Sequence, residues 1–151
     1  MPATLYLDSC ALQRPLDALR SAHEVAESEC VVAILVAAHT GSVELVWSFA
    51  LEYECIQRIP APRLAWTEVV RRLTTRTVRP DDGIIARARE LSTLHRLSAL
   101  DATHVACAEA AGALMVTVDR RLATRCADAS LLGGTRVVGP MAAAALVDES
   151  E

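Results

Sequence analysis

Leu5-Tyr6-Leu7-Asp8 and Leu114-Met115-Val116-Thr117-Val118-Asp119 share one pattern, a short apolar run that ends in an aspartate. Stretches with strand and helix patterns alternate along the chain, which predicts βαβ units and a parallel sheet. The carboxyl ends of parallel strands meet at one edge of the sheet, where such folds bind their ligands. We therefore expect Asp8 and Asp119 to lie near each other at that edge, although they are far apart in the sequence.

A second strand and its helix bring a third acid towards this edge. Residues 43–47 have the strand pattern, and Ser48 is suited to cap the helix that follows. Glu54 lies in that helix, but Glu52 competes for the same role. Two positions along a helix correspond to about 200° of rotation, so only one of the two can face the edge. Periodicity leaves the choice open, because apolar residues surround both.

The fourth acid, Asp101, lies one turn into a helix that begins after Ser98. His104 follows one turn later and can face the same way, although a single histidine there more often packs or hydrogen-bonds than ligates a metal. Ser9 and Thr117 flank two of the acids. Their hydroxyl groups are suited to orient a carboxylate or a metal-bound water.

Each acid also has an ordinary role when it is taken alone. Asp8 suits a turn, Asp101 and Asp119 suit helix caps, and Glu54 is spaced for an exposed ion pair with Arg58. If these ordinary roles were the whole explanation, all four acids would have to have reached one sheet edge independently of one another. Carboxylates gathered there repel one another unless a cation holds them, and a divalent metal ion is the simplest candidate.

The length of 151 residues predicts a single domain over residues 1–151. We expect an α/β fold with three layers, α/β/α, around a central, mostly parallel sheet of four to five strands. Residues 76–79 are expected to form a short edge strand, residues 136–138 the last strand and residues 142–145 part of a terminal helix. No apolar run approaches the ~20 residues of a membrane span, and the first residues lack the basic region and apolar stretch expected of a secretion signal. We therefore expect a cytoplasmic protein that does not contact a membrane.

The basic residues exclude several classes of enzyme. All 15 are arginine, so the chain has no lysine amine. This excludes Walker-type nucleotide sites, Schiff-base enzymes, and the receiver and haloacid-dehalogenase sites that also place acids after strands.

The five cysteines are widely spaced and form no CxxC pair, which indicates free thiols rather than disulfides or a zinc site.

Four segments together resemble the PIN domain family. Leu5 to Ser9 is similar to its first strand and first acid, and Ser48 followed by Glu54 is similar to its second motif. Residues 99–106 (ALDATHVA) resemble the third motif, and residues 113–122 resemble the fourth. The resemblance runs nearly end to end and favours Glu54 over Glu52. The chain has Cys10 where many members have Asn or Ser, and Arg120 where many have a further acid.

The resemblance implies a metal-dependent endoribonuclease, most often the VapC-type toxin of a type II toxin–antitoxin pair. Its four acids would hold one or two Mg²⁺ or Mn²⁺ ions; they are Asp8, Glu54, Asp101 and Asp119. Three arginines near the motif ends are candidates for contact with the RNA backbone; they are Arg14, Arg120 and Arg121. The expected partners are an RNA substrate, a cognate antitoxin and, through apolar helix surfaces, a second copy in a homodimer.

Two other functions fit the same residues. A non-catalytic PIN-like module would bind RNA or a protein, although such a role does not need the four acids. A metal-dependent phosphatase or other small-molecule hydrolase is the third hypothesis, and the absence of lysine and of a histidine cluster weighs against it.

Overall fold

Five parallel strands form the centre of the protein. The computed structural model describes residues 2–127 and 135–150 of the chain. The strands lie in the order β3-β2-β1-β4-β5, and each neighbouring pair is parallel. Their bounds are β1 (Ala3–Leu7), β2 (Val43–Ser48), β3 (Thr74–Val78), β4 (Leu114–Val116) and β5 (Val137–Val138). The predicted parallel sheet is confirmed.

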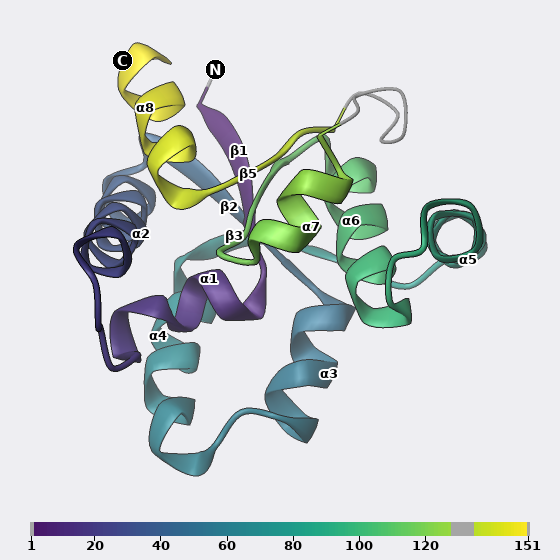
Figure 1. The fold of residues 1–151 in the computed structure, drawn as a ribbon, viewed down its shortest axis with the longest axis horizontal. Coiled ribbons are helices and arrows are strands. Elements are labelled where there is room, and N and C mark those ends of the chain that lie inside the picture. The colour runs from purple at the N-terminus through teal and green to yellow at the C-terminus, as the bar shows by residue number, and fades with distance from the viewer. Residues whose placement is uncertain (1, 128–134, 151) are drawn as a thin grey trace.

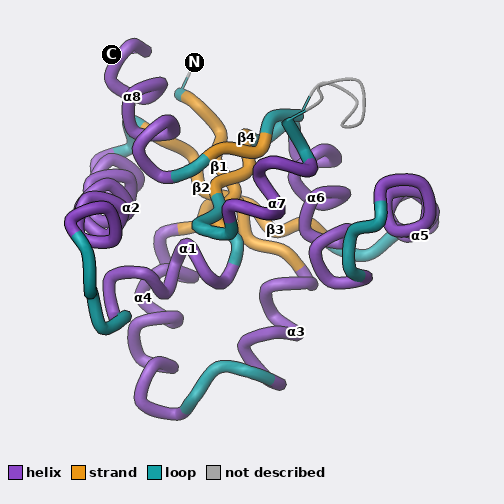
Figure 2. Tube along the Cα trace, in the orientation of Figure 1, coloured by secondary structure: helices purple, strands orange, loops and turns teal. Residues whose placement is uncertain are grey.

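Helices cover both faces of this sheet (Figure 1). On one face α2 packs against β2 and α8; on the other, α6 packs against β2, β3 and β4 and is itself covered by α5. Figure 2 shows the strands enclosed between these helices, so the predicted three-layer fold is confirmed. The helices are α1 (Ser9–Gln13), α2 (Ala22–Thr40), α3 (Phe49–Gln57), α4 (Leu64–Leu73), α5 (Asp82–His95), α6 (Ala99–Ala111), α7 (Arg120–Arg125) and α8 (Pro140–Ser150).

The central strand β1 is buried on both faces. Leu5, Tyr6 and Leu7 are at most 3% exposed, because each face of the sheet lies under helices. Parallel strands covered in this way are continuously apolar rather than alternating. The edge strand β3 differs, with Thr75, Arg76 and Thr77 exposed to solvent.

Polar caps turn the chain from strand into helix at the carboxyl edge of the sheet. Asp8 follows β1 and accepts a hydrogen bond from the Ala11 amide at 3.0 Å, so it caps α1. Ser48 ends β2 and accepts a hydrogen bond from the Leu51 amide at 3.1 Å, so it caps α3. A side-chain oxygen at this position satisfies a helix amide that has no partner within the helix. Gly112, with a positive φ of 63°, ends α6 just before β4.

Most predicted boundaries lie within two residues of the observed ones. The helix predicted at 22–39 extends to Thr40, and the edge strand predicted at 76–79 begins earlier, at Thr74. The last strand is one residue shorter than predicted, and the terminal helix is longer. In the part of the chain that the structure describes, no helix has both the length and the apolar character to cross a membrane.

Candidate active site

The sheet order places Asp8 at the end of β1, with the ends of β2 and β4 on its two sides. β1 pairs with β2 on one side and with β4 on the other, and Leu7 is in register with Val116. The Asp8 amide continues the pairing beyond β1 and donates to the Val116 carbonyl at 3.1 Å. The chain crosses from β1 to β2 on one side, whereas β4 lies on the other. Ligands bind at such a switch point in open α/β sheets.

The Asp8 carboxylate is buried and accepts hydrogen bonds from its neighbours. Asp8 is only 5% exposed, and Oδ1 accepts hydrogen bonds from the Ala11 amide and from the Cys10 thiol at 3.1 Å. Burial raises the pKa of Asp8 above its ordinary value, although the hydrogen bonds from Thr117, Cys10 and Ala11 act in the opposite direction. Among residues 2–127 and 135–150, no basic side chain forms an ion pair with Asp8. A bound cation would stabilise this buried charge.

Glu54 is also buried, but both of its oxygens accept hydrogen bonds. Ser9 Oγ donates to Oε2 at 2.7 Å, and His104 Nε2 donates to Oε1. Burial alone would raise the pKa of Glu54, but the hydrogen bonds from His104 and Ser9, together with the nearby charge of Arg58, hold it below its ordinary value. The exposed ion pair considered between Glu54 and Arg58 is therefore wrong, since Glu54 points inward and is 8% exposed.

Glu52 points to a different part of the protein. It accepts a hydrogen bond from Trp47 Nε1 at 2.8 Å and lies 3.5 Å from Arg71 Nε. Trp47 belongs to β2 and Arg71 to α4. The structure thus places Glu54, and not Glu52, beside Ser9, the residue of α1 that follows Asp8.

Asp101 and Asp119 lie at the starts of two other helices. Asp119 is exposed and caps α7, with Oδ1 accepting from the amides of Arg121 at 2.9 Å and Leu122 at 3.2 Å. Its own amide donates to Thr117 Oγ1 at 3.1 Å. Asp101 is half-buried in the first turn of α6, where its amide donates to Ser98 Oγ at 3.1 Å.

Two sets of contacts connect these acids. Thr117 hydrogen-bonds Asp8 and also accepts from the Asp119 amide, so it connects the ends of β1 and β4. Ser9 connects the start of α1, which Asp8 caps, to Glu54, and His104 connects Glu54 to the helix that carries Asp101. Within the described residues, however, no three His, Cys, Asp or Glu side chains are close enough to hold one ion together. The acids border a common edge without forming a closed ligand set.

The donor chemistry of this edge fits Mg²⁺ or Mn²⁺. Hard divalent ions prefer carboxylate oxygens, and Mg²⁺ commonly keeps several waters while one or two carboxylates and substrate phosphates hold it. An open arrangement of this kind needs no closed cage of protein ligands. It would not suit structural zinc, which takes four ligands from the protein.

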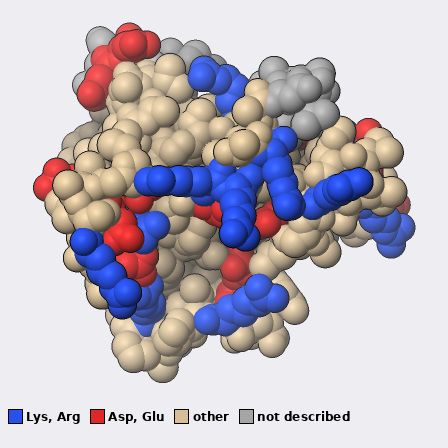
Figure 3. Space-filling model, viewed as in Figure 1, with Lys and Arg blue, Asp and Glu red and all other residues tan. Residues whose placement is uncertain are grey.

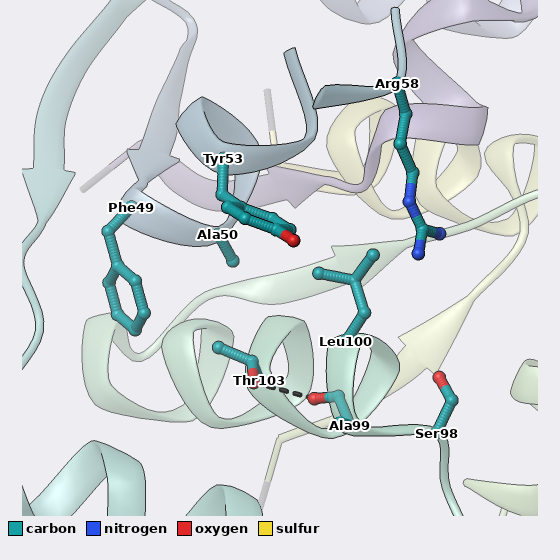
Figure 4. Close-up of a pocket in the computed structure, with 8 residues that line it drawn as sticks. All are labelled: Phe49, Ala50, Tyr53, Arg58, Ser98, Ala99, Leu100 and Thr103. Carbon is teal, nitrogen blue, oxygen red and sulfur yellow. Dashed lines mark hydrogen bonds between the residues drawn. The ribbon is translucent and has the colours of Figure 1, made fainter. Parts of the chain in front are cut away.

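Two hollows flank the acids. One has a volume of about 560 Å³ and lies between α3 and the start of α6. Figure 4 shows Tyr53 of α3 and Arg58, which follows α3, on the opposite side from Leu100 of α6 and Ser98, which precedes α6. The other has a volume of about 450 Å³ and lies between α2, α7 and α8, with Asp119 and Arg120 in its wall. Both are large enough to accept part of a flexible ligand.

Basic side chains lie around this edge. Figure 3 shows a band of them across the face that carries α7, with acidic side chains visible in the gaps. Arg120 and Arg121 are exposed and form no ion pair with any described residue. Arg14 differs, because it lies 3.0 Å from Asp17 and 3.6 Å from the buried Glu27. Arg120 and Arg121 are therefore freer than Arg14 to contact an anionic ligand.

Sequence reasoning missed the importance of two residues at this site. Tyr6 was treated only as an apolar strand residue, and His104 was favoured as a packing or hydrogen-bonding residue without a partner. In the structure Tyr6 bonds His104, and His104 bonds Glu54. Tyr6 and His104 are 98 positions apart, so no local pattern could have paired them.

Comparisons with known proteins agree with this fold. The family model "PIN domain" matches residues 5–127. PAE2754 from Pyrobaculum aerophilum is similar in structure, with a TM-score of 0.60, 13% identity, and coverage of 97% of this chain and 90% of that one. FitAB bound to the IR36 DNA fragment is similar with a TM-score of 0.59, 17% identity, and coverage of 90% and 94%.

FitAcB from Neisseria gonorrhoeae is a third similar structure, with a TM-score of 0.54, 18% identity, and coverage of 91% of this chain and 98% of that one. At these identities the likeness shows the fold alone. A search of curated proteins finds no match. The family model covers most of the chain, including the strands and helices that carry all four acids. The chain therefore belongs to the PIN domain family.

Proposed function

We propose that this protein is a metal-dependent endoribonuclease that cleaves phosphodiester bonds of RNA in the cytoplasm. PIN domains are generally nucleases. The observation that carries the proposal is the buried Asp8 carboxylate, which lies between the ends of β1 and β4 without a basic partner among the described residues. Four residues would hold one or two Mg²⁺ or Mn²⁺ ions; they are Asp8, Glu54, Asp101 and Asp119.

The residues around this edge suit hydrolysis of a phosphodiester. When bound, a divalent ion supplies Lewis-acid chemistry, activating a water for attack on phosphorus and offsetting charge on the phosphate oxygens. Thr117 bonds both Asp8 and the Asp119 amide and so fixes the ends of β1 and β4 relative to each other, and Ser9 fixes the carboxylate of Glu54. The forked guanidinium groups of Arg120 and Arg121 are suited to bind phosphates on either side of the scissile bond.

The two hollows support a path for an RNA strand across the acids. The hollow beside α3 offers the Tyr53 ring and the Arg58 guanidinium, which are groups that stack on bases and bind phosphates. The hollow beside α7 offers Arg120. A single strand that passed from one hollow to the other would cross the ends of β1 and β4.

We further propose that the chain is the toxin of a type II toxin–antitoxin pair. The resemblance to VapC-type toxins and the fold likeness to FitAB and FitAcB support this part of the proposal. Exposed apolar side chains are concentrated on helices that could receive a partner; they are Val25, Val32 and Val36 on α2, Tyr53 and Ile56 on α3, and Leu64 and Val69 on α4. Such surfaces suit a cognate antitoxin or a second copy in a homodimer.

Cleavage of a labelled RNA by purified protein tests the proposal. Wild-type protein should cleave single-stranded or structured RNA in Mn²⁺ and stop when a chelator is added. Asp8→Asn should lose on the order of 100-fold or more in rate. Mutation of a residue that only orients a metal ligand already lowers metal affinity or activity about 10–100-fold, and Asp8 would be a ligand itself. Glu29→Gln is the matched control, since it removes an exposed carboxylate of α2 away from the acids.

Full activity in Asp8→Asn would show that the site has been placed wrongly. A folded wild-type protein that binds RNA and cleaves none of it in Mn²⁺ would favour the second candidate function, a non-catalytic PIN-like module. One observation favours that candidate, the absence of a closed three-ligand group among the described residues.

A further inference from the structure

We propose that His104 is a positioning residue that fixes the carboxylate of Glu54 for metal binding, and that Tyr6 and Ser48 fix His104 in turn. The inference rests on the proposed function and adds to it three side chains that would not touch the metal or the RNA. It comes from a continuous row of hydrogen bonds that crosses the protein interior behind the four acids.

The row runs through side chains that are almost completely buried. Ser48 and Tyr6 are 0% exposed, and His104 is 2% exposed. Ser48 Oγ lies 2.7 Å from the Tyr6 hydroxyl, which lies 2.5 Å from His104 Nδ1. His104 Nε2 then bonds Oε1 of Glu54. The Tyr6 and His104 rings also contact each other, with centroids 5.7 Å apart and planes tilted by 57°.

The donors of this row can all point in one direction. An ionised carboxylate only accepts hydrogen bonds, so Nε2 of His104 must carry a hydrogen towards Glu54. In the neutral ring Nδ1 is then an acceptor, and the Tyr6 hydroxyl donates to it. The Tyr6 oxygen in turn accepts from the Ser48 hydroxyl, whose oxygen accepts from the Leu51 amide at 3.1 Å. Every polar atom of the row has a partner, as buried polar groups require.

The row connects rigid elements to a side chain that would otherwise move. Tyr6 belongs to the central strand β1, Ser48 ends β2, and His104 lies in α6. Glu54 extends from α3, and Ser9 holds its second oxygen at 2.7 Å. Because both oxygens are held, Glu54 has one fixed orientation before any ion binds. Residues that fix a metal ligand in this way commonly change metal affinity or activity 10–100-fold when they are lost.

Three substitutions separate positioning from packing. His104→Leu removes the donor and keeps an apolar side chain in place. His104→Gln returns an amide N–H near the position of Nε2. Tyr6→Phe removes only the hydroxyl and keeps the ring. His39→Leu is the matched control, because it makes the same chemical change at an exposed position of α2.

Each variant is first checked for wild-type circular dichroism. Its affinity for Mn²⁺ is then measured by calorimetry without RNA, and kcat and KM are measured with RNA. We expect His104→Leu to bind Mn²⁺ about 10–100-fold more weakly, with a matching loss in kcat and little change in KM. His104→Gln should recover much of this loss, Tyr6→Phe should lose a few-fold, and His39→Leu should match the wild type.

Unchanged Mn²⁺ affinity in a folded His104→Leu would overturn the inference, and so would equal losses in His104→Gln and His104→Leu. If His104→Leu does not fold, Tyr6→Phe is the test of the inference. Wild-type Mn²⁺ affinity and wild-type kcat in Tyr6→Phe would then overturn the inference. None of these results contradicts the proposed function, provided that Asp8→Asn does not cleave RNA. A wild-type protein that neither binds Mn²⁺ nor cleaves RNA would overturn both.

Discussion

Asp8 and Glu54 are both buried carboxylates, yet their surroundings shift their pKa values in opposite directions. Burial dominates at Asp8 and raises its pKa above the ordinary 3.8. At Glu54 the hydrogen bonds from His104 and Ser9 outweigh burial and lower the pKa below 4.5. Glu54 is thus prepared to stay ionised by the protein alone. At Asp8 the hydrogen bonds from Thr117, Cys10 and Ala11 do not outweigh burial, and a bound cation would supply the further stabilisation.

This contrast predicts that Asp8→Asn stabilises the metal-free protein. The folded state binds the Asp8 proton more tightly than the unfolded state does. Stability therefore falls as pH rises from 3.8 through the raised pKa of the folded state. At pH 7 the ionised Asp8 is a cost, and the amide removes it while it can still cap α1. We expect a gain of about 0.5–2 kcal/mol in the free energy of unfolding, measured by urea titration in chelator.

Glu54→Gln is the companion variant with the opposite expectation. The folded pKa of Glu54 is lowered, so its contribution is present above about pH 4.5 and is lost as pH falls through the folded value. Its removal should destabilise the protein at pH 7. If Asp8→Asn also proved less stable than the wild type with an unchanged m-value, the electrostatic account of Asp8 would be wrong.

Glu52 and His104 show what local sequence could not decide. Both Glu52 and Glu54 have apolar neighbours, so helical periodicity did not separate them. The difference lies in contacts with other elements, since Glu52 bonds Trp47 and Glu54 bonds His104, which is 50 positions away. The family resemblance supplied that tertiary information for Glu54. It supplied none for His104, because the resemblance of residues 99–106 to the third motif names no partner for the histidine.

The starts of the helices were predicted best, because residues close in the sequence determine where a helix begins. Ser48, Ser98 and Asp119 each cap a helix as the sequence indicated. A cap needs only a short side chain and an amide two or three positions ahead, so neighbouring residues determine it. The ends of the short strands were less accurate. β5 has only two residues, and its limits depend on its pairing with β4 rather than on its own sequence.

Ser98→Ala tests whether the start of α6 serves the site as well as the fold. Ser98 Oγ accepts from the amide of Asp101 itself, so losing the cap should loosen the turn that carries this acid. We expect a loss of about 0.5–2 kcal/mol in stability together with a lower cleavage rate. Urea titration measures the first effect and the labelled-RNA assay measures the second.

Ser21→Ala provides the control for this prediction. Ser21 caps α2 in the same way, with Oγ accepting from the Glu24 amide at 3.1 Å, but no candidate metal ligand lies in that turn. It should lose similar stability and keep the wild-type cleavage rate. Equal loss of rate in both variants would mean that the effect comes from stability and not from Asp101.

The order of the strands assembles the site at the scale of the whole molecule. The sequence indicated strands that end in acids, but it did not show that β1 lies between β2 and β4. That order brings residues 8, 54 and 119 to one edge and places Asp8 between the others. Strand order depends on how the helices pack on the two faces, which no single segment encodes. The fold class was predictable, whereas the neighbours of each strand came from the structure and from the family.

Basic and acidic side chains both lie at this edge of the sheet. The chain has a net charge of −4, yet basic side chains form a band across the face that carries α7 (Figure 3). Acidic side chains lie in the gaps of this band, where a divalent ion would reverse the local charge and allow a polyanion to approach. We therefore expect binding of RNA at this edge to depend on the metal more than on any single arginine.

Calorimetric titration of Mn²⁺ into the protein at neutral pH, with Asp8→Asn and Glu29→Gln alongside, tests the central claim most directly. We predict that the wild type and Glu29→Gln bind Mn²⁺ with the same affinity. Asp8→Asn should bind on the order of 100-fold more weakly or not at all, because it removes the carboxylate that lies between the other acids. Equal Mn²⁺ affinity in all three proteins, or no binding by the wild type, would contradict the account.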